Sequence, residues 1–282
     1  MKKINIIDLT IYKYKLKKKE VFMSKLRDGI YGLAIADALG VPFEFKKRGT
    51  FTCKGMVGFG TWNQVAGTWS DDTSMTLATC KSIKDKNKID LEDIRKNFEA
   101  WLFEGKFACH GETFDVGETT RDALGEGHGI DDFYANGNGS LMRILPLAFT
   151  DARDDEIESV SSITHAHEIS KKACLDYVHL ARKLIAGEKL EELGLDHIKN
   201  KPKDEIQSTG FVLHTLEASL WCLLNTNSYK KAVLKAINLG DDTDTTGAVT
   251  GGLAGIIYGF DNFPKEWVDE LKGKDLIDEC LF

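Results

Sequence analysis

A row of glycines near the C-terminal end of the chain most constrains how it can fold. Gly247, Gly251, Gly255 and Gly259 recur at every fourth position, so on an α-helix they lie along one face. Each glycine in a helix interior costs about 1 kcal/mol relative to alanine. A cost of this kind is offset where another backbone or a ligand approaches closely along that face. The pattern therefore predicts a buried helix packed against a close neighbour.

Directly before this helix the chain carries a dense acidic segment. Residues 240–247 read Gly-Asp-Asp-Thr-Asp-Thr-Thr-Gly, and two interpretations are open. Asp and Thr are good N-cap residues, and acidic groups favour a helix N-terminus. Hard divalent cations such as Mg²⁺ also prefer oxygen ligands, and a cation would relieve the mutual repulsion of Asp241, Asp242 and Asp244. Capping requires only one or two of these oxygens.

A second acidic cluster opens another predicted helix. It reads Ser70-Asp71-Asp72-Thr73, with a hydroxyl before two carboxylates. Two clusters of complementary form, far apart in the sequence, are what a site for paired cations needs, because each helix can donate one wall. The two segments together therefore favour metal binding over simple capping.

Two further carboxylates occupy unusual positions. Asp37 falls among alanines on or beside the apolar face of a helix predicted from Ser24 to Gly40. A carboxylate there must be hydrogen-bonded, paired with a charged group or close to a cation. A structural hydrogen bond is the alternative to a role near a cation. Glu44 lies between two aromatic residues just after that helix. Desolvation there raises a carboxyl pKa and suits acid–base work, whereas an exposed loop glutamate is the ordinary alternative.

Residues 105–140 are rich in glycine and lack helical periodicity, and a loop of this length is often functional. The segment 136–143 resembles a loop of backbone donors for phosphate oxygens, with a helix starting near Ser140. A plain turn is the alternative. His165 and His167 follow at i, i+2 spacing without a nearby cysteine, which excludes zinc. His165 is interpreted as a substrate hydrogen-bonding group or a helix cap, and His167 as solvent-facing.

The composition narrows the class of protein. The chain has 282 residues with a net charge of −7 and no evident basic face, which argues against nucleic acid as a partner. Its six cysteines show no paired spacing, so we expect free thiols in a reducing compartment. No apolar run reaches membrane-spanning length, and a cytoplasmic enzyme is expected. Residues 1–22 are expected to form a basic arm, either flexible or an added strand, and residues 23–282 a single all-helical domain.

With both acidic clusters placed, the chain resembles the ADP-ribosylglycohydrolase family, which includes the dinitrogenase-reductase-activating glycohydrolases and the metal-dependent ADP-ribosylhydrolases. The resemblance runs from about Leu26 to Phe260. It rests on six motifs in order: Ala36-Asp37-Ala38-Leu39-Gly40 with Glu44, Ser70-Asp71-Asp72-Thr73, Asp115-Val116-Gly117 with Thr119-Thr120, Gly137-Asn138-Gly139 with Met142-Arg143, Thr164-His165, and Gly240 to Thr245.

The resemblance implies an all-α fold, a compact orthogonal bundle around two Mg²⁺ (or Mn²⁺) ions. The implied metal ligands are Ser70, Asp71, Asp72, Asp242, Asp244 and Thr245. The implied catalytic residues are Glu44 and Asp115. The implied substrate-binding residues are Gly117, Thr119, Asn138, Gly139, Ser140, Met142, Arg143 and His165. The chain departs from the family pattern at Ser70, where threonine is usual, and at Asp241, where a second glycine is usual.

By this resemblance the chain is expected to hydrolyse the glycosidic bond of ADP-ribosylated substrates, with modified arginine on a protein as the leading candidate. Two cations can fix the 2″,3″-diol and a water beside C1″, and Glu44 or Asp115 can take the proton of that water. Hydrolysis of a small ADP-ribosyl or N-glycosidic metabolite is the alternative enzyme function. A non-catalytic ADP-ribose-binding or structural protein is the alternative of another class, and the intact ligand set speaks against it.

Overall fold

The computed structural model describes the backbone of residues 6–282 and the side chains of residues 22–282. Within that part of the chain the regular structure is helical, with three isolated β-bridges and no strand, which confirms the predicted all-α class. The α-helices are α1 (Ile6–Gly40), α2 (Asp71–Lys86), α3 (Leu91–Glu104), α4 (Glu118–Glu126), α5 (Asp154–Ser161), α6 (Glu168–Ile185), α7 (Asp196–Lys199), α8 (Val212–Leu224), α9 (Tyr229–Ile237), α10 (Thr243–Tyr258), α11 (Lys265–Glu270) and α12 (Lys274–Cys280). The 3₁₀ helices are η1 (Val41–Phe43), η2 (Gly60–Trp62), η3 (Phe133–Ala135), η4 (Leu145–Phe149), η5 (Leu190–Glu192), η6 (Lys203–Glu205) and η7 (Phe260–Asn262).

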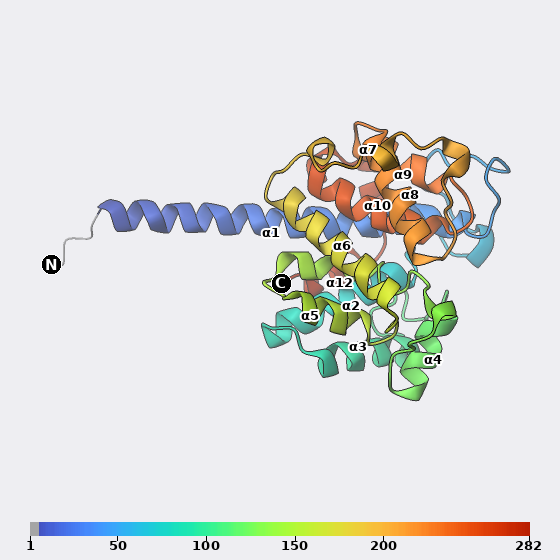
Figure 1. The fold of residues 1–282 in the computed structure, drawn as a ribbon, viewed down its shortest axis with the longest axis horizontal. Helices are drawn as coiled ribbons and strands as arrows, with labels where there is room; N and C mark the ends of the chain where they lie inside the picture. The colour runs from blue at the N-terminus through green and yellow to red at the C-terminus, as the bar shows by residue number, and fades with distance from the viewer. Residues whose placement is uncertain (1–5) are drawn as a thin grey trace.

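The C-terminal half of α1 and the whole of α10 run through the middle of the bundle, whereas the N-terminal half of α1 projects away from it (Figure 1). Helices α7, α8 and α9 lie on one side of them and helices α2 to α5 on the other, as Figure 1 shows. Helix α10 packs against α1, α6, α8 and α9. Every residue of α10 from Thr243 to Ile256 is buried, so this helix forms the centre of the core. Its N-terminus is the acidic segment identified in the sequence.

The backbones of α1 and α10 touch along a stripe of small residues. A Cβ atom added at Gly251 would overlap the carbonyl oxygen of Gly32, and one added at Gly247 would come within 2.9 Å of the carbonyl oxygen of Ala36. The close neighbour that the glycine spacing predicts is therefore α1. Gly259 does not take part, because it lies after the last residue of α10 and ends that helix with a φ of +78°.

The structure differs from the sequence-based prediction at the N-terminus. Helix α1 begins at Ile6 rather than at Ser24, so it runs through most of the segment predicted as a separate arm. Residues 6–28 contain neither glycine nor proline and are rich in lysine and leucine, which favour helix. The first five residues of the arm lie outside the described part. The division into an arm and a domain stays a prediction.

Two other predicted elements need correction. No helix starts near Ser140; the chain makes a turn there and continues into η4. Leu145 precedes Pro146, and a residue before proline is disfavoured in the α conformation, which explains why the turn does not extend into an α-helix.

Helix α4 lies within the segment predicted as an irregular loop. It buries only three of its nine residues and contains Gly125, so its periodicity is weak.

The structure also shows the state of the cysteines and the length of the apolar helices. All six cysteines are free thiols; five are buried and Cys109 is half-buried. Within residues 6–282, none of the helices combines the length and the apolar character needed to span a bilayer.

Candidate active site

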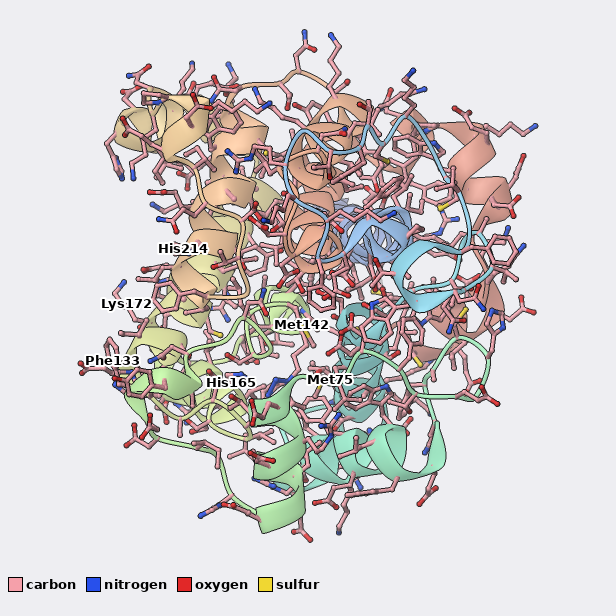
Figure 2. All side chains as sticks on the ribbon, turned by 90° about the vertical axis from the view of Figure 1, so that its right-hand side faces the viewer. Met75, Phe133, Met142, His165, Lys172 and His214 are labelled. Atoms are coloured by element: carbon pink, nitrogen blue, oxygen red, sulfur yellow. The ribbon has the colours of Figure 1, made fainter. Side chains whose placement is uncertain are left out.

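One cleft of about 530 Å³ gathers most of the residues that the sequence singled out. Its walls come from the start of α10, the segment that leads into α4, and the loop before η4. Figure 2 views the molecule with Met142 and His165 of this cleft labelled near the middle. The predicted residues that line the cleft are Glu44, Asp71, Asp115, Gly117, Thr119, Asn138, Gly139, Met142, His165, Asp242 and Thr245.

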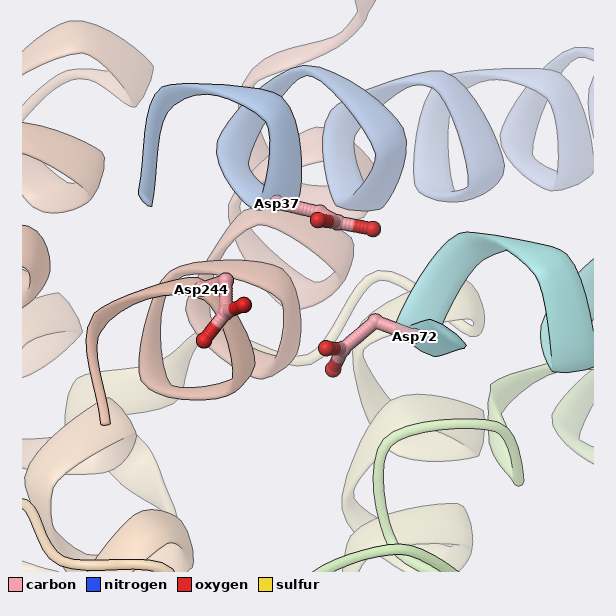
Figure 3. Close-up of side chains that lie close together, drawn as sticks. All are labelled: Asp37, Asp72 and Asp244. Atoms are coloured by element: carbon pink, nitrogen blue, oxygen red, sulfur yellow. The ribbon is translucent and has the colours of Figure 1, made fainter. Parts of the chain in front are cut away.

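The two acidic clusters meet at the base of this cleft. The hydroxyl of Thr245 on α10 donates to Oδ2 of Asp72 on α2 over 3.3 Å, although 173 positions separate the two residues. Figure 3 shows Asp72, Asp244 and Asp37 converging from α2, α10 and α1. Two groups of carboxylates have oxygens within 4.8 Å of one another, namely Asp37 with Asp72 and Asp244, and Glu44 with Asp115 and Asp244. Asp244 belongs to both groups.

Asp37 serves mainly to fix the start of α2. Its carboxylate accepts hydrogen bonds from the backbone N–H groups of Ser70 and Thr73, over 2.9 and 3.0 Å. The hydroxyls of the same two residues also donate to it, over 2.9 and 2.6 Å. The cap of α2 thus comes from α1, and the hydrogen-bonded interpretation of Asp37 is correct. Asp37 is not among the predicted metal ligands, although its position among alanines in the sequence indicated that its carboxylate needs a partner.

Two other carboxylate oxygens in this cluster lack such donors. Oδ1 of Asp72 and Oδ2 of Asp244 are buried and have no hydrogen-bond partner in the described part of the chain. A buried charged oxygen without a donor is strongly unfavourable. A bound cation removes this penalty, and a set made only of carboxylate and hydroxyl oxygens suits Mg²⁺ or Mn²⁺ rather than zinc. The residues therefore fit hard divalent cations.

The remaining predicted ligands surround these oxygens. The hydroxyl of Ser70 lies 2.9 Å from Oδ1 of Asp37 and 3.1 Å from Oδ2 of Asp72, so it joins the α1 carboxylate to the α2 carboxylate. Oδ1 of Asp242 accepts from the backbone N–H of Thr245 over 3.2 Å and caps α10. Asp241, by contrast, is exposed and does not line the cleft. Its charge therefore lies outside the site.

Glu44 is buried, 5% exposed, so the alternative of an exposed loop glutamate is wrong. Burial raises the pKa of Glu44 to about 10, and repulsion from Asp115 and Asp242 adds to this effect. The indole N–H of Trp62 donates to Oε2 of Glu44 and partly opposes the rise in its pKa. Asp115 also has a raised pKa, chiefly through burial, and its backbone is in the left-handed region at a φ of +55°.

The other acidic groups follow the same pattern. Burial, followed by repulsion from neighbouring carboxylates, raises the pKa values of Asp71, Asp72 and Asp244 well above their ordinary range. Burial also raises the pKa of Asp37 to about 6, although its four donors lower it. Carboxylates this close cannot all ionise in a low dielectric unless a positive charge joins them. Without a cation, several of these carboxyl groups must therefore hold a proton at neutral pH.

Two predicted substrate contacts do not line the cleft. Ser140 is fully buried and accepts from the hydroxyl of Ser161 over 3.0 Å. Arg143 is fully buried behind the loop, with its guanidinium 4.4 Å from the centre of the Phe98 ring. Their role as substrate contacts stays a prediction, and their observed contacts support the loop from behind. His167 is half-buried and caps α6, which corrects its assignment as solvent-facing.

The fold and the cleft together define an all-helical protein with a cluster of buried carboxylates at a cleft of about 530 Å³. The sequence profile of the ADP-ribosylglycohydrolase family matches residues 18–281. The chain belongs to this family, whose named relatives are hydrolases of ADP-ribosyl linkages.

Individual relatives cover most of the chain. It is 33% identical to ADP-ribosylarginine hydrolase Tri1 of Serratia proteamaculans, over 90% of this chain and 77% of that protein. It is 31% identical to the ADP-ribosyl-[dinitrogen reductase] glycohydrolase of Rhodospirillum rubrum, over 86% of this chain and 88% of that protein. A solved structure titled ADP-ribosylglycohydrolase-related protein complex superposes with a TM-score of 0.79 at 28% identity and covers 93% of this chain and 97% of that one.

Proposed function

We propose that this protein is a Mg²⁺- or Mn²⁺-dependent hydrolase that removes ADP-ribose from ADP-ribosylated arginine. The observation that carries the proposal is a pair of buried oxygens, Oδ1 of Asp72 and Oδ2 of Asp244, that have no hydrogen-bond partner among the described residues. They lie next to Asp71, Asp242 and Thr245, which line the cleft. The relatives named for ADP-ribosylarginine and for ADP-ribosylated dinitrogen reductase support the substrate class.

The residues that would hold two cations are Ser70, Asp71, Asp72, Asp242, Asp244 and Thr245. When bound, the cations supply Lewis acidity and bind the ribose diol and a water. The protein contributes the fixed positions of these ligands. Asp37 holds α2, and the close contact between α1 and α10 holds the other wall.

Glu44 and Asp115 are the candidates for proton transfer. Both line the cleft, and Glu44 has a pKa raised to about 10 chiefly by burial. A carboxyl with a raised pKa can hold a proton at neutral pH and give it to a leaving group, and its conjugate base can take one from water. The Trp62 N–H fixes Oε2 of Glu44, and the carboxyl groups of Glu44 and Asp115 lie close enough to share a proton.

The rim of the cleft beside Glu44 supports arginine as the modified residue. Phe45, Trp62 and Phe114 all line the cleft there. The centre of the Trp62 ring lies 6.2 Å from that of Phe45 and 5.8 Å from that of Phe114. A planar guanidinium stacks favourably on aromatic rings, whereas a serine side chain gains nothing comparable.

The test uses peptides ADP-ribosylated on arginine or on serine, incubated with Mg²⁺ or with excess chelator. We expect release of ADP-ribose from the arginine peptide in Mg²⁺ and none in chelator. Faster release from the serine peptide would overturn the arginine assignment. Release only from small ADP-ribosyl compounds would favour a metabolite hydrolase, and binding without release would indicate a non-catalytic protein.

A further inference from the structure

The buried guanidinium of Arg143 contacts both the loop of the cleft and the residue before His165. It donates to the carbonyl oxygen of Gly139 over 3.0 Å and to the hydroxyl oxygen of Thr164 over 3.0 Å. The Thr164 hydroxyl lies 2.7 Å from Nδ1 of His165. Arg143, Thr164 and His165 therefore form a chain of hydrogen bonds that ends at the cleft, which His165 lines.

We infer that Arg143, acting through Thr164, fixes His165 as the tautomer whose Nε2–H donates a hydrogen bond to an oxygen of the ligand in the cleft. This inference rests on the proposed function for the identity of that ligand, ADP-ribose. It makes Arg143 and Thr164 positioning residues, since neither lines the cleft.

The direction of the hydrogen bonds follows from what each group can donate. A guanidinium has no acceptor, so the Thr164 oxygen must accept from Arg143. The Thr164 side chain is fully buried, and its hydroxyl hydrogen can then be used only toward Nδ1 of His165. If Nδ1 carried the hydrogen instead, the Thr164 hydroxyl would keep a donor with no acceptor in the interior, which is unfavourable. Nδ1 is thus the acceptor and Nε2 carries the hydrogen.

The doubly protonated imidazolium does not compete with this tautomer. Burial, together with the positive charge of Arg143, lowers the pKa of His165 to about 3. His165 is therefore neutral at physiological pH and presents one donor to the cleft. This state also agrees with the rejection of zinc, because a nitrogen that carries a hydrogen cannot ligate a metal.

The Nε2 edge of His165 faces two glycines of the loop. A Cβ atom built at Gly137 would lie 3.5 Å from Nε2, and one built at Gly139 would lie 3.3 Å from Nε2 and 2.8 Å from Cε1. Any side chain at Gly139 would therefore crowd this edge of the imidazole ring. Within the described part of the chain the His165 ring hydrogen-bonds only through Nδ1, and the residue lines the cleft, so the Nε2 donor is left for a ligand.

The chemistry of the site selects the class of acceptor. A neutral N–H donor next to a glycine-rich loop suits an oxygen of a phosphate or of a ribose hydroxyl. Both occur in ADP-ribose, and a phosphate oxygen is the stronger acceptor because it is charged. Comparing the affinities of ribose 5-phosphate and ribose, which differ only in the phosphate, separates the two sources.

The first experiment reads the tautomer directly. Nitrogen-15 NMR of the histidine-labelled, full-length protein in Mg²⁺ distinguishes Nε2–H from Nδ1–H, and H165Q assigns the signal among the seven histidines. We expect Nε2–H in the wild type and in T164S, which keeps the hydroxyl. In T164V we expect the Nδ1–H population to rise at least about fivefold, as loss of one buried hydrogen bond implies. An Nδ1–H signal in the wild type, or no change in T164V, would overturn the relay.

The second experiment measures the affinity for ADP-ribose by calorimetry in Mg²⁺. We expect binding to weaken about fivefold or more in T164V and to stay within about twofold of wild type in T164S. H165Q places an amide N–H near the position of Nε2 and should bind more tightly than H165N, whose amide is too short. G139A crowds the His165 ring but keeps the Thr164 hydroxyl, so it should weaken binding while Nε2–H stays the main tautomer, which keeps the test usable if T164V folds poorly.

The two proposals fail in different ways. A wild-type protein that holds the Nε2–H tautomer but binds no ADP-ribose would overturn the proposed ligand, and with it the proposed function. Equal ADP-ribose affinity in T164V and T164S, with the tautomer shifted only in T164V, would overturn the role of Nε2–H in recognition while hydrolysis stayed intact.

Discussion

The side-chain amide of Asn138 donates a hydrogen bond to Oδ2 of Asp242 over 2.8 Å. The same amide also donates to the hydroxyl of Thr215 over 2.9 Å, and the backbone N–H of Asn138 donates to the carbonyl oxygen of Gly210. The loop of the cleft is therefore tied to the acidic end of α10. The proposed substrate-binding residue Asn138 and the proposed metal ligand Asp242 therefore share one hydrogen-bond network.

Replacing Asn138 by alanine should weaken Mg²⁺ binding. N138A leaves Oδ2 of Asp242 without its donor and free to rotate, and loss of such an outer partner costs about 10- to 100-fold in metal affinity or activity. Calorimetric titration with Mg²⁺ measures the effect. N227A changes an exposed asparagine on the surface and is the matched control. Equal Mg²⁺ affinity in N138A and the wild type would contradict this prediction.

Replacing Asp244 by asparagine should separate stability from metal binding. Asp244 is buried, and repulsion from Glu44 and Asp115 adds to the burial that raises its pKa. D244N replaces an ionisable carboxyl by a neutral amide. In chelator the variant should therefore have a higher melting temperature than wild type, and its free energy of unfolding should be larger by about 1 to 3 kcal/mol. Mg²⁺ should no longer raise its melting temperature, and hydrolysis should be lost.

Thermal melts in chelator and in Mg²⁺, together with turnover assays, check these three outcomes. D204N, at an exposed aspartate, should behave as the wild type. A D244N protein that Mg²⁺ still stabilises as strongly as wild type would show that Asp244 is not a ligand.

The metal-free protein should lose stability as the pH rises from about 6.5 to about 8. The native pKa of Glu44 is raised from 4.5 to about 10, so between these values the native state holds a proton that the unfolded state has released. Unfolding then becomes more favourable as the pH increases. Below pH 6.5, His165 acts in the opposite direction because its pKa is lowered from 6.5 to about 3, which sets the lower limit of the window.

Chemical denaturation in chelator at several pH values measures this slope. In Mg²⁺ the slope should flatten or reverse, because cations bind the deprotonated carboxylates and compete less with protons at higher pH. The same negative slope with and without Mg²⁺ would argue against a cation in the cluster.

Trp62 should matter more for arginine-linked than for serine-linked ADP-ribose. W62L removes the ring that faces the cleft, and loss of a cation–π contact of about 0.5 to 2 kcal/mol predicts a roughly 2- to 30-fold lower kcat/KM on the arginine peptide. W62F keeps a ring but removes the N–H that donates to Glu44, so it separates stacking from proton chemistry. F103L, at an exposed phenylalanine of α3, is the control. An equal loss of kcat/KM on both peptides would show that Trp62 acts only through its hydrogen bond to Glu44 and not by stacking on the arginine.

Replacing Gly251 by alanine should destabilise the protein, whereas the same change at Gly125 should not. A Cβ at Gly251 would overlap the Gly32 carbonyl oxygen, and overpacking of this kind costs about 1 to 3 kcal/mol or more. Gly125 has open space around it in α4, so G125A should be neutral or stabilise by up to about 1 kcal/mol. Denaturant unfolding in Mg²⁺ compares them, and a G251A protein as stable as G125A would contradict the close contact.

The parts of the site that the sequence predicts are those with a local signal. The two acidic clusters share composition and stand at helix starts, so their convergence could be expected from residue type alone. Glu44 carries its own signal in the flanking aromatic residues. The glycine spacing likewise predicts the contact of α10 with a close neighbour, although not that this neighbour is α1.

The parts that the sequence does not predict depend on distant contacts. Asp37 caps a helix that starts more than thirty positions later, and no local pattern links it to Ser70 and Thr73. Arg143 is fully buried, which is rare for arginine, and no local pattern shows that its guanidinium contacts Thr164. Helix α4 has too few buried residues to produce a periodic pattern.

The direct contact of α1 with α10 has a consequence for ion selectivity. Because main chain rests on main chain there, no side-chain spacer can be lengthened or shortened to widen the gap between Asp37 and Asp244. Mg²⁺–oxygen bonds are about 2.0–2.1 Å and Ca²⁺–oxygen bonds about 2.3–2.6 Å. In the proposed metal site a larger ion would have to be accommodated by rotation of the carboxylates alone, because the glycine contacts fix the distance between α1 and α10.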